Sequence, residues 1–208
     1  MSARILIRGG CVLSLGEKTP NFSEADVLID EGRVAEVGPG LRVRDAEQVD
    51  ATDTIVMPGF VDTHRHVWES LFRNLGDVGS PAIYGPHYQP DDVYAATLIG
   101  LLGAVDAGIT TVVDWCDVGA GEGHFEAALQ AHGDSGVRSV LAYAKPRWVQ
   151  GDEDWRSGLS GAKSRAAGKP MLTAVAGAPD PAPADIDAVA RNWGRARELT
   201  LPIHMHLG

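Results

Sequence analysis

The 208-residue sequence predicts an α/β protein, with a small β-rich segment over residues 1–57 and alternating strands and helices over residues 58–208. Two observations support this prediction. Short apolar runs separated by turn residues fill the first segment, and such runs are typical of β-strands. After Pro58-Gly59, short apolar runs alternate with stretches of helical periodicity, which is the pattern of parallel βαβ units.

The β-rich segment is expected to form part of a small β-sandwich or open barrel. Asp30-Glu31-Gly32 indicates a hairpin turn, because glycine readily adopts the positive φ that such turns need. Four strands are expected, at Arg4–Leu15, Ala25–Ile29, Arg33–Val37 and Gln48–Val56.

The second segment is expected to begin with a buried strand, Ile55–Val61. A helix should follow at Pro90–Ala107, because proline and two aspartates suit its first turn and Gly108 suits its end. Its apolar residues recur at helical spacing, at Leu98, Leu101, Leu102 and Val105. The elements expected after it are a strand at Thr110–Asp114, a helix at His124–Ala131, a strand at Val137–Ala144, a weak helix between Pro146 and Lys169, a strand at Met171–Ala176, a helix at Ala184–Leu199 and a strand at Pro202–Leu207.

Two architectures fit this alternation, an open doubly wound sheet and a closed (β/α)8 barrel. No glycine-rich phosphate loop follows the first strand, which argues against the nucleotide-binding form of the open sheet. About five βα units are too few to close a barrel of eight strands. We therefore expect the missing strands to come from the remainder of a longer chain or from a second polypeptide.

Composition excludes several classes of protein. The chain has 18 basic and 28 acidic residues, a net charge of −10, and such a chain repels nucleic acid and anionic membranes. No stretch approaches the roughly 20 apolar residues of a membrane helix, and the N-terminus does not resemble a signal peptide. The two cysteines, Cys11 and Cys116, indicate no disulfide framework, so a cytoplasmic location is expected.

The strongest chemical signal is the pair His64 and His66 after the first strand of the second segment. Residues i and i+2 of a strand point to the same face, so both imidazoles can reach one cation. Neutral imidazole is the commonest protein ligand for metals and suits zinc and iron. The alternative is a pair of loop histidines at the surface, since this spacing often arises by chance.

Three segments carry a resemblance to a known family. Pro58–His66 resembles PGxxDxHxH, the first-strand signature of the amidohydrolase superfamily. Leu71–Asp77 and Ala107–Asp114 resemble the segments that follow it in the branch with cytosine deaminase, guanine deaminase and triazine hydrolase. The opening strands resemble the N-terminal half of that family's small β domain. The resemblance implies that residues 58–208 are the first part of a (β/α)8 hydrolase barrel.

The resemblance also implies a metal site. His206 takes the place of the fifth-strand ligand, and His204 lies deeper on the same face, where it either supports the ligands or packs. Binuclear relatives use a fourth-strand lysine, but Met171–Asp180 contains none. One divalent ion is therefore expected, zinc first and iron as the alternative. The acid/base glutamate would follow Gly208, and the sixth- and eighth-strand ligands would also lie outside these residues.

Other residues are weaker candidates for substrate binding or for support of the ligands. Each also has a plain structural interpretation as a packing, capping or solvated residue. These candidates are Asp62, Trp68, Arg73, His87 and Asp114. His124 and His132 are assigned to an outer helix without function, and Cys116 is interpreted as a small buried thiol.

The implied function is metal-dependent hydrolysis of a C–N bond in a small molecule, foremost deamination of a nitrogen heterocycle by a metal-activated water. Amide or cyclic-amide hydrolysis and dechlorination would use the same residues. A non-catalytic half-barrel subunit of a split enzyme is the alternative from another class. Because an open sheet edge would aggregate alone, an oligomer or a completing chain is expected.

Overall fold

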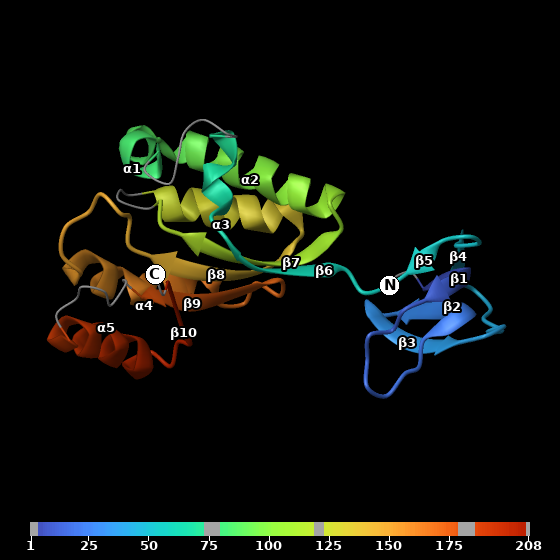
Figure 1. Ribbon diagram of the computed structural model, residues 1–208. Helices are drawn as coiled ribbons and strands as arrows, with labels where there is room; N and C mark the ends of the chain where they lie inside the picture. The colour runs from blue at the N-terminus through green and yellow to red at the C-terminus, as the bar shows by residue number, and fades with distance from the viewer. Residues whose placement is uncertain (1–3, 73–79, 119–122, 179–185, 207–208) are drawn as a thin grey trace. The chain divides into compact units, whose positions relative to one another are not determined.

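The structure, a computed structural model, describes residues 4–72, 80–118, 123–178 and 186–206. The chain divides into two compact units, Met1–Gly59 and Phe60–Gly208 (Figure 1). The sequence analysis placed this boundary before Pro58, whereas the structure places it after Gly59.

The first unit is a sheet in the order β3-β2-β1-β4, with β5 also paired to β1. Its antiparallel pairs are β1 with β2 and β2 with β3, whereas β4 and β5 run parallel to β1. The buried Asp26 carboxylate ties the sheet to its loops by accepting the Gly9 and Leu41 N–H groups. The strands are β1 Ile5–Val12, β2 Phe22–Asp30, β3 Arg33–Gly38, β4 Glu47–Asp50 and β5 Ile55–Val56.

Two expected strands of this region were wrong in extent. The strand expected at Gln48–Val56 is interrupted, because Asp50 accepts both the N–H and the O–H of Thr52 and turns the chain. The strand expected at Ile55–Val61 is also divided. Its first two residues pair with the first unit as β5, and Pro58-Gly59 separates them from the first strand of the second unit.

The second unit is a parallel sheet in the order β10-β9-β8-β7-β6. Each strand lies beside its neighbour in sequence, so the order has no switch point. This is the order of a barrel wall, and it excludes the doubly wound alternative. The strands are β6 Phe60–Arg65, β7 Ile109–Cys116, β8 Arg138–Ala144, β9 Leu172–Ala178 and β10 Ile203–Met205.

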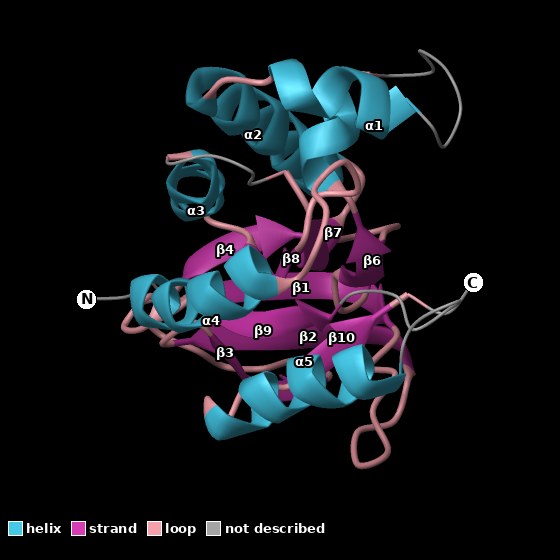
Figure 2. Ribbon diagram, turned by 90° about the vertical axis from the view of Figure 1, so that its left-hand side faces the viewer, coloured by secondary structure: helices cyan, strands magenta, loops and turns pink. Residues whose placement is uncertain are grey.

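Helices cover the outer side of this sheet and follow one another around it (Figure 2). They are α2 Pro90–Asp106, α3 His124–Ser135, α4 Glu153–Ala166 and α5 Ile186–Glu198. Three short elements were expected to be loop: η1 Val67–Leu71, α1 Ser80–Tyr84 and η2 Gly85–His87. No helix within the described residues is long and apolar enough to cross a membrane.

Two expected burial patterns were wrong. On α2, Leu102 and Val105 are about half exposed, and the buried face consists of smaller residues around Leu101. The reason is close packing, since a Cβ on Gly100 would lie 3.0 Å from the Val67 carbonyl oxygen of η1. On β6, Phe60 and Val61 are 56% and 59% exposed, because this strand pairs only with β7 among the described residues.

We expect Gly177→Ala to destabilise the second unit by roughly 1–3 kcal/mol through overpacking. A Cβ at Gly177 would lie 2.7 Å from the Ala144 Cβ and 3.1 Å from the Tyr143 carbonyl oxygen. Gly194→Ala on α5 is the control, because no atom lies within 4 Å of its added Cβ. This helix substitution should be neutral or stabilising by up to about 1 kcal/mol. Urea denaturation measures both, and equal effects would contradict the packing argument.

Candidate metal centre

Three histidines from opposite edges of the second sheet meet at its C-terminal end. His64 lies in β6, His66 directly follows it, and His206 directly follows β10. One ring nitrogen from each lies within 4.8 Å of the others. The His64 ring centroid is 5.3 Å from that of His66 and 4.6 Å from that of His206. Since β6 and β10 are the outermost strands, the sheet must curl to bring these ends together.

A buried carboxylate orients His66. Asp117, in the loop after β7, is 1% exposed and its Oδ1 lies 3.1 Å from Nδ1 of His66. The same oxygen accepts the indole N–H of Trp68 at 2.7 Å, and Oδ2 lies 3.5 Å from Nε of Arg147. Because a carboxylate only accepts hydrogen bonds, Nδ1 of His66 carries the proton and Nε2 has a free lone pair.

Asp117 was missed by the sequence reasoning. The available signal was a second carboxylate three residues after Asp114, at the catalytic end of a parallel strand. Only its contact with His66, 51 residues away along the chain, identifies its role.

His204 contacts a ring nitrogen of His64, much as Asp117 contacts one of His66. Nε2 of His204 lies 3.4 Å from Nδ1 of His64, so one ring donates and the other accepts. This contact leaves Nε2 of His64 for another partner. The sequence left the role of His204 open, and the structure places it against a ring nitrogen of His64.

Trp115 forms a floor beneath the histidines and was also missed. Its indole is 6% exposed, and its ring centroid lies 4.5 Å from that of His206 and 5.9 Å from that of His64. The rings of His204 and His66 lie 5.6 and 6.4 Å away. Small residues on neighbouring strands, Ala142, Ala144 and Val175, pack around the indole and leave room for it.

The surroundings of His64 and His206 favour the neutral form of these two imidazoles. Burial, followed by the charges of His66 and His204, lowers the pKa of His64. Burial, followed by the charges of His64 and His66, lowers the pKa of His206. Neutral imidazole is the form that binds metals.

The donor set fits a divalent ion. Nε2 of His206 is buried and has no hydrogen-bond partner, although buried polar atoms are normally paired. It lies in a cluster of three imidazoles whose candidate ligand nitrogens are within 4.8 Å of one another. Three imidazole nitrogens suit zinc and ferrous iron, so His64, His66 and His206 could hold such an ion.

The weaker candidates from the sequence have different surroundings in the structure. Asp62 accepts the backbone N–H of His64 at 3.2 Å and pairs with Arg65 at 2.9 Å, so it shapes the end of β6. Asp114 is buried and accepts the Val67 N–H. His87 is exposed in η2, and the described contacts do not join it to the histidine cluster. Arg73 lies outside the described residues.

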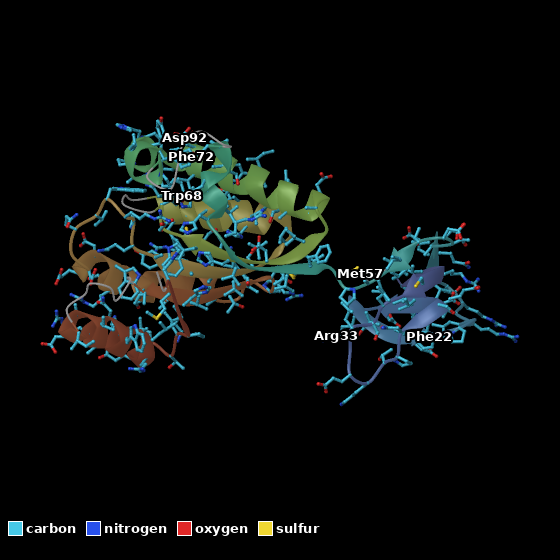
Figure 3. The ribbon with its side chains drawn as sticks, viewed as in Figure 1. Phe22, Arg33, Met57, Trp68, Phe72 and Asp92 are labelled. Carbon is cyan, nitrogen blue, oxygen red and sulfur yellow. The ribbon has the colours of Figure 1, made fainter. Side chains whose placement is uncertain are left out.

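Trp68 lies in the core, where it cannot reach a substrate. It is 1% exposed and packs beside Phe72, with ring centroids 5.5 Å apart (Figure 3). Its N–H holds Asp117, so it acts on His66 through that carboxylate. Cys116 is a buried free thiol, as expected, and burial raises its pKa.

The model of the amidohydrolase family matches residues 55–208, which include all three histidines. The 5-methylthioadenosine/S-adenosylhomocysteine deaminase of Symbiobacterium thermophilum is 29% identical, over 98% of this chain and 49% of that protein. A variant of atrazine chlorohydrolase from Arthrobacter aurescens TC1, solved with zinc and atraton, superposes with a TM-score of 0.82 at 22% identity, over 98% of this chain and 53% of the other.

An adenosine deaminase from Xanthomonas campestris with bound zinc has a TM-score of 0.81 at 19% identity, over 98% of this chain and 49% of the other. The likeness to these two solved structures shows a shared fold and confirms the expected partial barrel. The chain spans about half the length of all three relatives.

We expect the metal-free protein to lose stability as the pH falls below about 6.5, the ordinary histidine pKa in an unfolded chain. Since the folded pKa values of His64 and His206 are lowered, the unfolded state binds more protons below that pH. This stability is fully present above pH 6.5 and is lost as the pH falls through the folded pKa values. In the double variant His64→Asn/His206→Asn, the free energy of unfolding should fall less steeply between pH 8 and pH 5. Urea denaturation in the presence of a chelator measures it. If the variant and the wild type show the same pH dependence, His64 and His206 are not its source.

Proposed function

The chain belongs to the amidohydrolase family, and from this membership we propose that it carries the metal-binding half of a hydrolase that cleaves C–N bonds. The observation that carries the proposal is the histidine cluster, in which ligand nitrogens of His64, His66 and His206 lie within 4.8 Å of one another and Nε2 of His206 is unpaired.

A single zinc ion is the proposed cofactor, with iron as the alternative. Three imidazole donors suit zinc, and both structural relatives described above were solved with it. Strand β9, Leu172–Ala178, contains no lysine that could bridge a second ion. When bound, such an ion supplies Lewis-acid activation of water at neutral pH.

The described residues each have a part in preparing this site. His64, His66 and His206 would hold the ion. Asp117 fixes the tautomer of His66 by accepting a hydrogen bond from its Nδ1–H group. Trp115 packs against the rings of His64 and His206 and would shield that side of the ion from water.

The proposed substrate class is an aminated nitrogen heterocycle, with ammonia as the leaving group. Two of the relatives described above are deaminases of adenosine compounds, which supports this choice. The third is a chlorohydrolase, so dechlorination of a heterocycle is the second candidate. We propose that the acid/base glutamate that moves the proton to the leaving group lies outside the described residues.

We further propose that additional strands complete the barrel and the site. Among the described residues, β6 and β10 each pair on one side only, and the β6 residues Phe60 and Val61 are more than half exposed. A second polypeptide, another copy or the rest of a longer chain could cover them. The two free cysteines, Cys11 and Cys116, support a reducing, cytoplasmic setting.

We expect His64→Ala, His66→Ala and His206→Ala each to reduce bound zinc and to abolish ammonia release from an adenosine compound or an amino-triazine. Each change removes one of three nitrogen donors. Elemental analysis of the purified protein measures bound zinc, and an ammonia assay on the protein together with the strands that complete its barrel measures ammonia release. The control is His87→Ala, which removes an exposed histidine.

Unchanged zinc in all three variants would exclude the ligand assignment. Chloride release without ammonia release would select the dechlorinase candidate. Bound zinc with no turnover of either substrate class by the completed barrel would favour a non-catalytic half-barrel.

We expect Asp117→Asn to weaken zinc binding by about 10–100-fold, because the amide can present an N–H to Nδ1 of His66 and favour the wrong tautomer. The control is Asp152→Asn, since Asp152 accepts bonds from Lys145 and Asn192 and contacts no histidine of the cluster. Competition with a fluorescent zinc chelator measures both affinities. If the two variants bind equally, Asp117 does not orient the ligand.

A further inference from the structure

A buried chain of hydrogen bonds joins three elements of the second unit. On β7, Oδ2 of Asp114 lies 2.8 Å from Nε2 of His132 on α3. Nδ1 of His132 lies 2.7 Å from the hydroxyl of Ser139 on β8. The three residues are 1%, 2% and 1% exposed. No substrate can reach them, so this Asp-His-Ser arrangement does not act as a nucleophilic triad.

The chain ends at the metal-binding segment. Oδ1 of Asp114 accepts the backbone N–H of Val67 at 2.9 Å, and Val67 directly follows His66. The Val67 side chain is fully buried and packs against Leu101 and Val112. The carboxylate therefore fixes the backbone immediately after a ligand, with one oxygen for Val67 and the other for His132.

The direction of the bond between His132 and Asp114 follows from the carboxylate. An ionised carboxylate only accepts hydrogen bonds, so Nε2 of His132 donates to Asp114. In a neutral imidazole, Nδ1 of His132 then accepts the Ser139 O–H. Removal of the Nε2 donor would leave a buried carboxylate oxygen unpaired, and the carboxylate would move to find another partner.

We propose that His132, which the sequence analysis assigned no function, is a positioning residue for His66. It holds Asp114 in the position from which that carboxylate fixes the Val67 backbone. The inference rests on the proposed metal site of His64, His66 and His206. It is independent of Asp117, which acts on the His66 ring, whereas Asp114 acts on the backbone that carries it.

The test compares His132→Gln with His132→Asn in the purified protein. A glutamine amide reaches the position of Nε2 and can still donate to Asp114, whereas an asparagine amide reaches the position of Nδ1 and keeps only the Ser139 contact. Cobalt(II) titration gives the affinity, and the visible absorption of the bound cobalt reports its ligand geometry. His132→Asn should bind cobalt about 10-fold more weakly or worse and alter the spectrum, while His132→Gln should stay within about 3-fold of wild type.

A second pair of variants, at Asp114, tests the same inference if the His132 variants fold poorly. Asp114→Asn and Asp114→Leu are close in size, but only asparagine offers an acceptor to the Val67 N–H. In Asp114→Asn the His132 tautomer can reverse, since Ser139 can donate to the Val137 carbonyl oxygen 3.3 Å away. Asparagine should retain cobalt binding within about 3-fold, and leucine should lose about 10-fold or more.

Asn192→Ala is the control for a loss of stability alone. It removes the hydrogen bonds of the buried Asn192 on α5 to Asp152 and to Arg156 on α4. This variant should unfold at lower temperature and bind cobalt as wild type does. Equal cobalt affinity within both variant pairs would overturn the positioning role while the metal site stood. Failure of the wild-type protein to bind cobalt would overturn the metal site and this inference with it.

Discussion

The curl of the parallel sheet in the second unit is the constraint on which the site depends. Strands β6 and β10 are the outermost of the five, yet the rings of His64 and His206 lie 4.6 Å apart between centroids. A flat sheet would separate these strands by four strand spacings, close to 20 Å. The curl is possible because β8 and β9 carry small residues on their inner face, and Trp115 fills the remaining space.

Two buried carboxylates, Asp114 in β7 and Asp117 in the loop after it, then position His66. Asp114 fixes the backbone after His66, and Asp117 fixes the ring of His66. Both are 1% exposed, and both are satisfied by hydrogen-bond donors, since an unpaired buried charge would be costly. Burial and the neighbouring histidines lower the pKa of His64 and of His206. Two carboxylates that are themselves buried therefore hold His66 within a cluster of imidazole nitrogens.

Much of the fold could be predicted from local pattern. Pro90 with two aspartates marked the start of α2, and the β-branched residues after Gly108 marked β7. The short helices between β6 and α2 were missed because their stability comes from aromatic packing around Trp68, which has no sequence period. The apolar stripe of α2 was misassigned because the approach of η1 at Gly100 selects small side chains there.

The sequence by itself determined the strand–helix alternation, the His64–His66 pair and its place at the catalytic end of a strand. These depend on spacing along the chain, since residues i and i+2 of a strand share a face whatever surrounds them. Only the tertiary structure decided the roles of Asp117, Trp115 and His132. Each acts through a partner brought near by the fold, 51 residues away for Asp117 and 18 for His132. Such contacts depend on the curl and packing of the whole sheet, which no local pattern encodes.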